Sequence, residues 1–221
     1  MSGENAVDIW GSIIIPTTIS DRRPPTLDHL SECELRCKGV EVIVVRDRWK
    51  NASRARNIGI AASRGQVICV IDDDVKLSQE KLLKLMKDVL ENDELFCISL
   101  DPHVLIVRYT DIIKTGGYDE RYKPTMCEDV ELMTKLIRMG LRKIDITCDT
   151  LDLVHLSYPR DRSKRYLLNQ KHLTWNYIRY GGIPLYKVIF RKNPLEVARR
   201  IKWLLEWIFY QRWRRRGIFT R

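Results

Sequence analysis

Hydrophobic and polar positions alternate in two distinct patterns over residues 1–156. Short runs of apolar, often β-branched side chains predict strands, and longer stretches with apolar residues at helical spacing predict helices. The predicted strands are residues 12–15, 40–45, 67–71, 95–100, 103–108 and 142–147, and the predicted helices are residues 27–37, 52–63, 77–90 and 128–139. Strands that alternate with helices in this way predict an α/β fold with a mostly parallel central sheet.

Capping residues support the predicted helices. Ser78 is a suitable N-cap for the third helix, and Gly39 and Gly140 follow two other helices, where glycine commonly ends a helix. The two prolines before residue 27 are expected to keep the chain out of a helix, so we expect one continuous helix from Leu27 to Cys37.

The last third of the chain has a different pattern. A helix is predicted from Asn193-Pro194 to Arg216, with apolar residues on one face and with tryptophans and arginines around them. This composition is typical of a helix that lies in the plane of a membrane interface. A helix that packs its apolar face on the rest of the protein has the same pattern, and both interpretations stay open. We expect a folded domain at residues 1–156 and a basic helical extension at residues 157–221.

Charge follows the same division. The chain of 221 residues has a net charge of +10, but residues 157–221 hold 17 basic and 3 acidic residues, and residues 1–156 hold 22 basic and 26 acidic residues. A basic extension attracts anionic partners. We expect an anionic membrane surface rather than nucleic acid, because the aromatic residues lie on an apolar helix face and not along a basic loop. The pattern predicts neither a membrane-spanning run nor a leader segment, so we expect a cytoplasmic protein bound peripherally to a membrane face.

Three consecutive aspartates, Asp72, Asp73 and Asp74, directly follow the predicted strand 67–71. Carboxylates this close repel one another, and burial increases the cost unless a positive charge neutralises them. Ligands of open α/β sheets bind at the carboxyl ends of the strands, and one or two carboxylates can hold Mg²⁺ there together with substrate phosphates. Strand geometry would point Asp72 and Asp74 one way and Asp73 the other. A solvated acidic turn explains the same three residues, and the triplet alone does not decide.

Further motifs surround this triplet in a defined order. They are an apolar strand that ends in Pro16-Thr17, then Arg56-Asn57-Ile58-Gly59, Gly116-Gly117-Tyr118-Asp119-Glu120 and Glu128-Asp129-Val130-Glu131-Leu132. In this order and spacing, residues 11–156 resemble the family-2 glycosyltransferases. The resemblance implies a GT-A fold, a Rossmann-like three-layer sandwich, and transfer of a sugar from a nucleoside-diphosphate sugar to an acceptor hydroxyl.

The resemblance also implies a donor site. The expected substrate-binding residues are Pro16, Thr17, Asp47, Arg56, Asn57, Asp72, Asp73, Gly116 and Gly117. Arg56 is expected near the diphosphate, because a guanidinium forms paired hydrogen bonds with phosphate. The expected metal ligands are Asp74, Asp72 and His155, which would hold Mn²⁺ or Mg²⁺ against the two phosphates.

The base of the donor stays open among UDP-, GDP- and dTDP-sugars. Asp47 lies in Arg46-Asp47-Arg48-Trp49, where the family more often has Asp-Asp-Gly-Ser. A turn residue with a solvated side chain is the alternative interpretation of Asp47.

Asp129, with Glu128 beside it, is the expected catalytic residue. Asp129 matches the family's base, which takes the proton of the acceptor hydroxyl on the face opposite the leaving group and so inverts the anomeric centre. Two buried adjacent carboxyls resist simultaneous ionisation, so one pKa of the pair is expected to rise. Acids in the first turn of a helix also stabilise its positive end without any catalytic role, and the order of the motifs is what favours catalysis.

Two other function classes fit parts of the sequence. A nucleotidyltransferase uses a similar sheet and similar metal carboxylates, but it usually has a Gly-rich basic loop after its first strand, and residues 16–20 contain none. A non-catalytic module that binds nucleic acid or a membrane is the second. The expected function is a metal-dependent glycosyltransferase of the hexosyltransferase type, whose acceptor is a glycan or a lipid-linked saccharide.

Overall fold

The computed structural model describes residues 8–18, 23–100, 103–122 and 128–156, together with residues 202 and 205. The chain divides into two compact units, Met1–Asp161 and Arg162–Arg221, and nearly all described residues belong to the first unit. The predicted interfacial helix lies outside the described residues apart from two helical positions, so it stays a prediction. None of the described helices is both long enough and apolar enough to cross a membrane.

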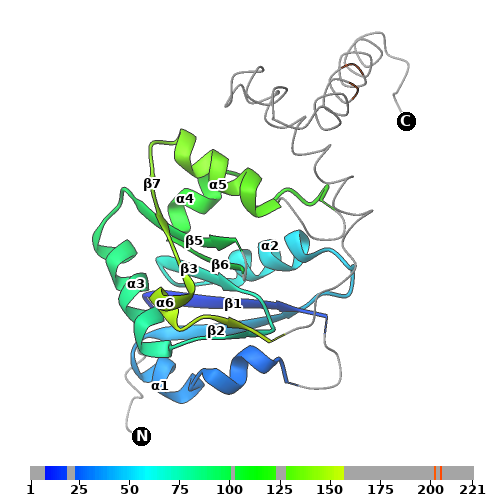
Figure 1. Ribbon diagram of the computed structural model, residues 1–221. Coiled ribbons are helices and arrows are strands. Elements are labelled where there is room, and N and C mark those ends of the chain that lie inside the picture. Colours follow the sequence, from blue (N-terminus) through cyan, green and yellow to red (C-terminus); the bar gives the residue numbers. More distant parts are fainter. Residues whose placement is uncertain are drawn as a thin grey trace, which may run out of the picture. The chain divides into compact units, whose positions relative to one another are not determined.

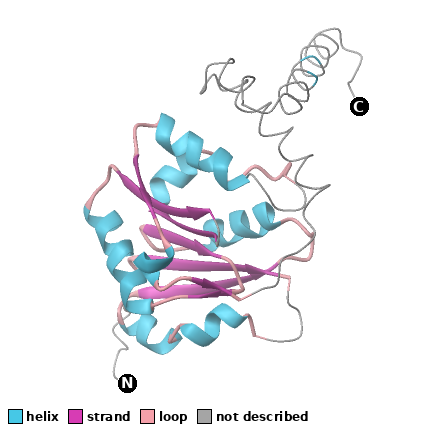
Figure 2. Ribbon diagram, in the orientation of Figure 1, coloured by secondary structure: helices cyan, strands magenta, loops and turns pink. Residues whose placement is uncertain are grey.

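In the described part of the chain, the first unit is built on a six-stranded sheet (Figures 1 and 2). In spatial order the strands are β2 (Val40–Arg46), β1 (Gly11–Thr17), β3 (Val67–Ile71), β6 (His103–Arg108), β5 (Leu95–Leu100) and β7 (Arg142–Asp145). Strand β6 runs antiparallel to both of its neighbours, and the other five strands share one direction. The register places Ile14 of β1 between Ile43 of β2 and Val70 of β3. The prediction of a mostly parallel α/β sheet is confirmed.

Helices cover both faces of this sheet. They are the 3₁₀ helix η1 (Pro25–His29), α1 (Glu32–Cys37), α2 (Ala52–Ala62), α3 (Gln79–Glu91), α4 (Tyr109–Lys114), α5 (Glu128–Arg138) and α6 (Cys148–Leu151). Successive residues of β1 serve opposite faces, because Ile13 belongs to a core with residues of α1 and α3, and Ile14 belongs to a core with residues of α2, α4 and α5. Both side chains are fully buried. A sheet that is apolar on both faces is the middle layer of three, as predicted.

All six predicted strands are present, but the prediction of one continuous helix from Leu27 to Cys37 is wrong. The segment is split into η1 and α1, because Pro25 begins a 3₁₀ turn and Ser31 has an extended backbone. The Ser31 hydroxyl accepts a hydrogen bond from the Glu34 backbone N–H (3.5 Å) and so caps a new helix. The predicted N-cap at Ser78 is confirmed.

Two short strands position the functional residues, and one of them begins at the end of the stretch 151–154, whose sequence pattern is strand-like. Strands β4 (Val75–Lys76) and β8 (Val154–His155) pair antiparallel, with Val75 opposite His155. Strand β4 follows the aspartate loop after β3 directly, so this pairing brings His155 beside that loop. Elements this short contain too few positions to show a hydrophobic period.

Candidate functional site

The loop between β3 and β4 carries the three aspartates. Strand β3 ends at Ile71, so strand geometry does not control the carboxylates and the predicted alternation of their directions is wrong. Each carboxylate has a different partner, which is Arg56 for Asp72, Thr17 for Asp73 and His155 for Asp74. The acidic triplet is therefore divided among three contacts.

Thr26 of η1 holds this loop in place. Its backbone N–H donates a hydrogen bond to the Asp73 carbonyl (3.1 Å), and its hydroxyl donates to the Asp72 carbonyl (2.8 Å). The same hydroxyl accepts a hydrogen bond from the Val75 backbone N–H (2.8 Å), and Thr26 is fully buried. Sequence reasoning missed this residue, because it lies 46 positions from Asp72 and no local pattern marks it.

Arg56 of α2 brings two of the acidic motifs together. One terminal guanidinium nitrogen donates to Glu128 (2.8 Å) and to Asp129 (3.2 Å), and the other donates to Asp72 (2.9 Å). The exposed fractions of the side chains are 4% for Arg56, 1% for Glu128, 15% for Asp129 and 29% for Asp72. The observed partners of Arg56 are thus protein carboxylates, and its expected contact with a diphosphate stays a prediction.

Three carboxylates contact the one guanidinium of Arg56 in the described part of this cluster. Burial, and then the charge of Asp129, raise the pKa of Glu128, in the direction expected for one member of an adjacent acidic pair. Burial alone would lower the pKa of Arg56, but the charges of Asp129, Asp72 and Glu128 outweigh it and raise that pKa well above its ordinary value. Arg56 therefore stays protonated and is a permanent cation in this cluster.

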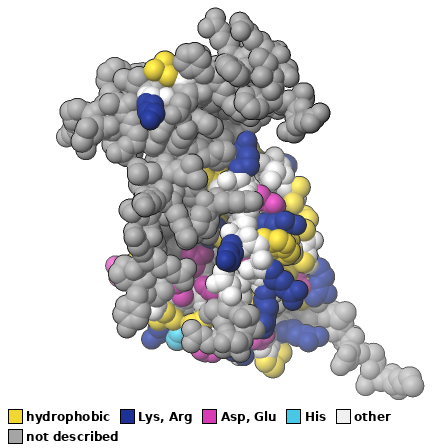
Figure 3. Space-filling model, turned by 90° about the vertical axis from the view of Figure 1, so that its right-hand side faces the viewer, with side chains coloured by type: hydrophobic (Ala, Val, Ile, Leu, Met, Phe, Trp, Pro, Cys, Tyr) yellow, Lys and Arg dark blue, Asp and Glu magenta, His cyan; other side chains and the backbone are white. Residues whose placement is uncertain are grey.

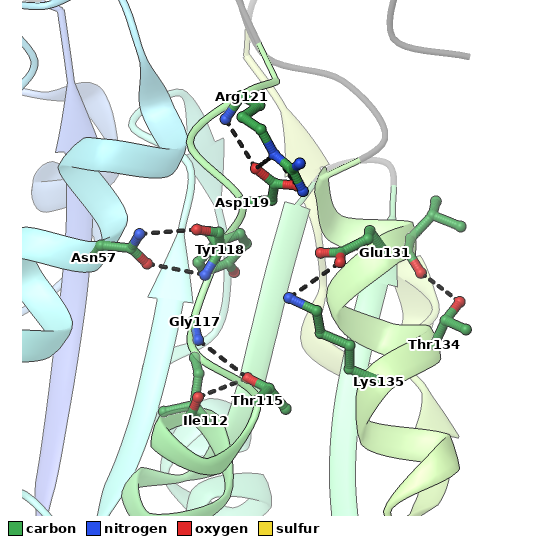
Figure 4. A network of polar contacts seen from close by, with 11 residues as sticks. Asn57, Ile112, Thr115, Gly117, Tyr118, Asp119, Arg121, Glu131, Thr134 and Lys135 are labelled. Atoms are coloured by element: carbon green, nitrogen blue, oxygen red, sulfur yellow. Dashed lines mark hydrogen bonds and ion pairs between the residues drawn. The ribbon is translucent and has the colours of Figure 1, made fainter. Parts of the chain in front are cut away.

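Asn57 fixes the loop that contains Gly116 and Gly117 (Figure 4). Its amide nitrogen donates to the Tyr118 carbonyl, and its amide oxygen accepts from the Tyr118 backbone N–H, both at 2.9 Å. Gly117 has a φ of +71°, and a Cβ atom built there would lie 2.7 Å from the Asn57 amide oxygen. Gly116 also has a positive φ, +79°, so the turn expected from the glycine pair is present. The expected contacts of these residues with substrate stay predictions.

Asp129 is the most exposed carboxylate of the motif Glu128–Leu132. Glu128 is 1% exposed, and Glu131 is 2% exposed and lies 3.0 Å from Lys135 (Figure 4). Asp119 of the preceding motif is engaged by the Arg121 guanidinium (Nε to Oδ1, 2.8 Å). Among these acids, Asp129 has the most exposed side chain, at 15%.

Asp74 and His155 form a second pair of neighbouring polar side chains. The His155 Nε2 atom lies 3.5 Å from Asp74 Oδ1, and the side chains are 26% and 18% exposed. The backbone of Asp74 accepts a hydrogen bond from the Leu156 N–H (2.7 Å), which fixes the pair relative to β4 and β8. Within the described ranges no group of three His, Cys, Asp or Glu side chains that could hold a metal ion is present, so the expected ligand Asp72 is separated from the other two. A carboxylate oxygen and an imidazole nitrogen at this spacing still fit a divalent ion that shares substrate phosphates.

The ends of β1 and β2 form the edge expected to hold the base and the ribose. Pro16 and Thr17 are buried, and the Thr17 carbonyl accepts a hydrogen bond from the Asp47 backbone N–H (2.7 Å). The Asp47 carboxylate accepts from the Trp49 N–H (3.0 Å), the contact of a turn residue, so its contact with a nucleotide stays a prediction. Figure 3 shows this edge of the molecule, where the basic side chains of the described residues gather to one side of a group of acidic ones.

Solved structures with this fold include a mannosyltransferase and the protein TarS. The mannosyltransferase PcManGT from Pyrobaculum calidifontis, in complex with GDP-Man and Mn²⁺, superposes with a TM-score of 0.62 and 13% identity over 90% of this chain and 75% of that one. TarS residues 1–349 from S. aureus superpose with a TM-score of 0.55 and 13% identity over 90% of this chain and 71% of that one, and TarS is also known in complex with UDP. A comparison with curated protein sequences gave no match. At this identity the superpositions show the fold.

The sequence itself matches one family model. The model of glycosyl transferase family 2 matches residues 20–145, which is more than half of the chain, and the matched range includes Arg56, the aspartate loop and Asp129. The match decides between the functions considered from the sequence, in favour of glycosyl transfer over nucleotidyl transfer or binding without catalysis. The protein belongs to glycosyl transferase family 2.

Proposed function

We propose that this glycosyltransferase is metal-dependent and inverting, with Asp129 as the catalytic base and with Asp74 and His155 as metal ligands. The main observation behind the proposal is that two acidic segments lie next to each other. Asp72 of the aspartate loop and Asp129 of α5 both contact the guanidinium of Arg56. A transferase of this kind needs a group that holds the donor and a base for the acceptor in one site.

A nucleoside-diphosphate sugar is the proposed donor. The ends of β1 and β2 meet the aspartate loop at the carboxyl edge of the sheet, where open α/β sheets bind nucleotides. The fold neighbours PcManGT and TarS were solved with GDP-Man and with UDP, which supports this class of donor. UDP-, GDP- and dTDP-sugars are the candidates to compare.

Asp74 and His155 are the proposed residues that hold the metal ion. A bound divalent cation would neutralise charge on the diphosphate as it leaves. We propose Mn²⁺ over Mg²⁺, because one of the two ligands is an imidazole nitrogen and Mg²⁺ strongly prefers oxygen ligands. The Mn²⁺ in the PcManGT structure supports the same choice.

Asp129 is the proposed base. Its carboxylate accepts the proton of the acceptor hydroxyl while the hydroxyl oxygen forms a bond with the anomeric carbon. The bond from that carbon to the diphosphate oxygen breaks at the same time, and the nucleoside diphosphate takes the electron pair. Attack opposite the leaving group inverts the configuration at the anomeric carbon.

A thermal-shift panel tests this proposal. The protein is melted with UDP-glucose, GDP-mannose or dTDP-glucose, each with and without Mn²⁺, because a ligand that binds the native state raises its melting temperature. We expect a Mn²⁺-dependent rise with at least one donor. Asp129→Asn should preserve this rise and lower transfer roughly 10²- to 10⁴-fold, the usual contribution of general base catalysis. No rise with any donor, or wild-type transfer by Asp129→Asn, would contradict the proposal.

The acceptor is proposed to be a glycan or a lipid-linked saccharide, reached at the cytoplasmic face of an anionic membrane. The excess of 17 basic over 3 acidic residues in residues 157–221 supports this location, since each basic residue near an anionic surface contributes roughly 1 kcal/mol.

A further inference from the structure

We propose that Arg56 is a positioning residue, which holds the base Asp129 at a fixed distance from Asp72 of the aspartate loop. The buried Glu128 holds Arg56 in place. The inference rests on the proposed function, because it takes Asp129 as the base. It gives Arg56 a role other than the diphosphate contact expected from the sequence.

The guanidinium is a rigid link between the two acidic segments. Its terminal nitrogens lie in one plane at a constant separation, and they contact Asp72 on one side and the pair Glu128–Asp129 on the other. A displacement of Arg56 therefore changes the position of Asp129 relative to Asp72.

Arg56 is itself held firmly, which a positioning residue requires. Its side chain is 4% exposed, and its central carbon lies 5.1 Å from the centre of the Tyr118 ring. Tyr118 is fixed in turn by the two hydrogen bonds to the Asn57 amide. Two adjacent residues of α2 therefore act together: Arg56 carries the guanidinium, and Asn57 fixes Tyr118, whose ring packs against it.

The two acids of α5 have different roles in this arrangement. Glu128 is almost fully buried and lies closer to the shared nitrogen (2.8 Å) than Asp129 does (3.2 Å). Asp129 is more exposed and is the acid that a substrate can reach. Glu128 therefore anchors Arg56, and Arg56 orients Asp129.

A direct contact between Arg56 and the diphosphate is the competing role. The burial of Arg56 behind three carboxylates disfavours it, since phosphate would have to displace carboxylates that already neutralise the guanidinium. The two roles predict different kinetics. A phosphate contact affects the affinity for nucleotide, whereas a positioning role affects turnover and does so only while Asp129 is present.

The test compares Arg56→Lys, Asp129→Asn and the double variant with the wild-type protein. The readouts are hydrolysis of UDP-glucose and GDP-mannose with Mn²⁺, water being the acceptor, and the affinity for UDP and GDP with Mn²⁺ by calorimetry. We expect Arg56→Lys to lower kcat roughly 10- to 100-fold, the loss expected from about 1 Å of misplacement, with nucleotide affinity unchanged within about threefold. In the Asp129→Asn background, Arg56→Lys should lower kcat no further.

The outcomes separate this inference from the proposed function. An equal loss from Arg56→Lys in both backgrounds, or a nucleotide affinity more than about tenfold weaker, would overturn the positioning role and leave Asp129 as the base. Wild-type hydrolysis by Asp129→Asn would instead overturn the proposed function. If Arg56→Lys does not fold, Glu128→Gln replaces it, with the same expected loss of kcat at unchanged affinity. Arg64→Lys, at an ion pair on the surface, is the matched control and should match the wild type.

Discussion

Two carboxylates on the same loop of this glycosyltransferase have partners of different kinds. Asp72 contacts Arg56, a buried cation that the protein supplies itself. Asp74 lies 3.5 Å from His155, and both of those side chains are partly exposed. The comparison teaches that a carboxylate beside a buried guanidinium already has its counter-charge, whereas a carboxylate beside an imidazole has a second metal ligand next to it.

In the mechanism that we propose, two residues that stand two positions apart have separate tasks. Asp72, through Arg56, orients the base, and Asp74 holds an exchangeable ion together with His155. Turn geometry after Ile71 makes the division possible, because it directs the two carboxylates to partners on α2 and on β8. Each site can be perturbed without touching the other.

The largest expected effect is on the free energy of unfolding when the buried cation Arg56 is removed. Arg56→Met leaves Asp72, Glu128 and Asp129 without their guanidinium, and removing one partner of a buried ion pair costs about 3–5 kcal/mol of folding free energy. Urea unfolding measures this loss. Arg64→Met is the matched control, because the Arg64 side chain is 71% exposed in its ion pair with Glu41 and a surface pair contributes about 0–1 kcal/mol. Equal losses for the two variants would show that the cluster does not depend on Arg56.

A smaller effect, on nucleotide binding, is expected at the proposed metal site of Asp74 and His155. His155→Ala should weaken the Mn²⁺-dependent binding of UDP or GDP by at least about tenfold, since even partners outside the first coordination sphere contribute that much, and it should leave the free energy of unfolding nearly unchanged. Calorimetry with and without Mn²⁺ measures the binding. His29→Ala on η1 is the control. Unchanged Mn²⁺ dependence in His155→Ala would remove His155 from the metal site.

The smallest expected effect is on the pH dependence of stability. The pKa of Glu128 is raised in the folded protein, mainly by burial, so the folded state holds this proton to higher pH than the unfolded state does. Its stabilising contribution is complete below the unfolded pKa and is lost as the pH rises through the folded pKa. As the pH rises above about 4.5, the ordinary pKa of a glutamate, Glu128→Gln should therefore lose less stability than the wild type, as measured by melting temperature. Glu80→Gln, at an exposed residue of α3, should follow the wild-type curve.

The sheet and most of its helices could be predicted from the sequence. The central strand β3 is a continuous apolar run, because both faces of the sheet are covered, as Ile13 and Ile14 of the neighbouring β1 show. The prediction of one helix at Leu27–Cys37 was wrong, because the apolar spacing continues across Ser31, where the backbone is extended. Apolar periodicity reports burial, and it does not report a capping residue that divides two short helices.

The residues of the candidate site could be predicted more fully than the contacts between them. The motif order predicted Asp72, Asp74 and Asp129 as site residues, and these stay predictions. The structure shows that Arg56 contacts both Asp72 and Asp129 and that the pairing of β4 with β8 places His155 next to Asp74. Arg56 and Asn57 were expected at the nucleotide, but their observed partners are carboxylates and the loop at Tyr118. Polar side chains have several chemically equivalent partners, and residue type alone does not choose among them.

The sequence by itself determined that this chain forms a mostly parallel α/β sheet and belongs to glycosyl transferase family 2, because local hydrophobic pattern and motif order are both properties of the linear chain. Only the tertiary structure decided which acid meets which cation. That choice depends on burial and on contacts between residues far apart in the chain, such as Arg56 with Asp129. Electrostatic energies change with distance and with exposure to solvent, and both quantities exist only once the chain has folded.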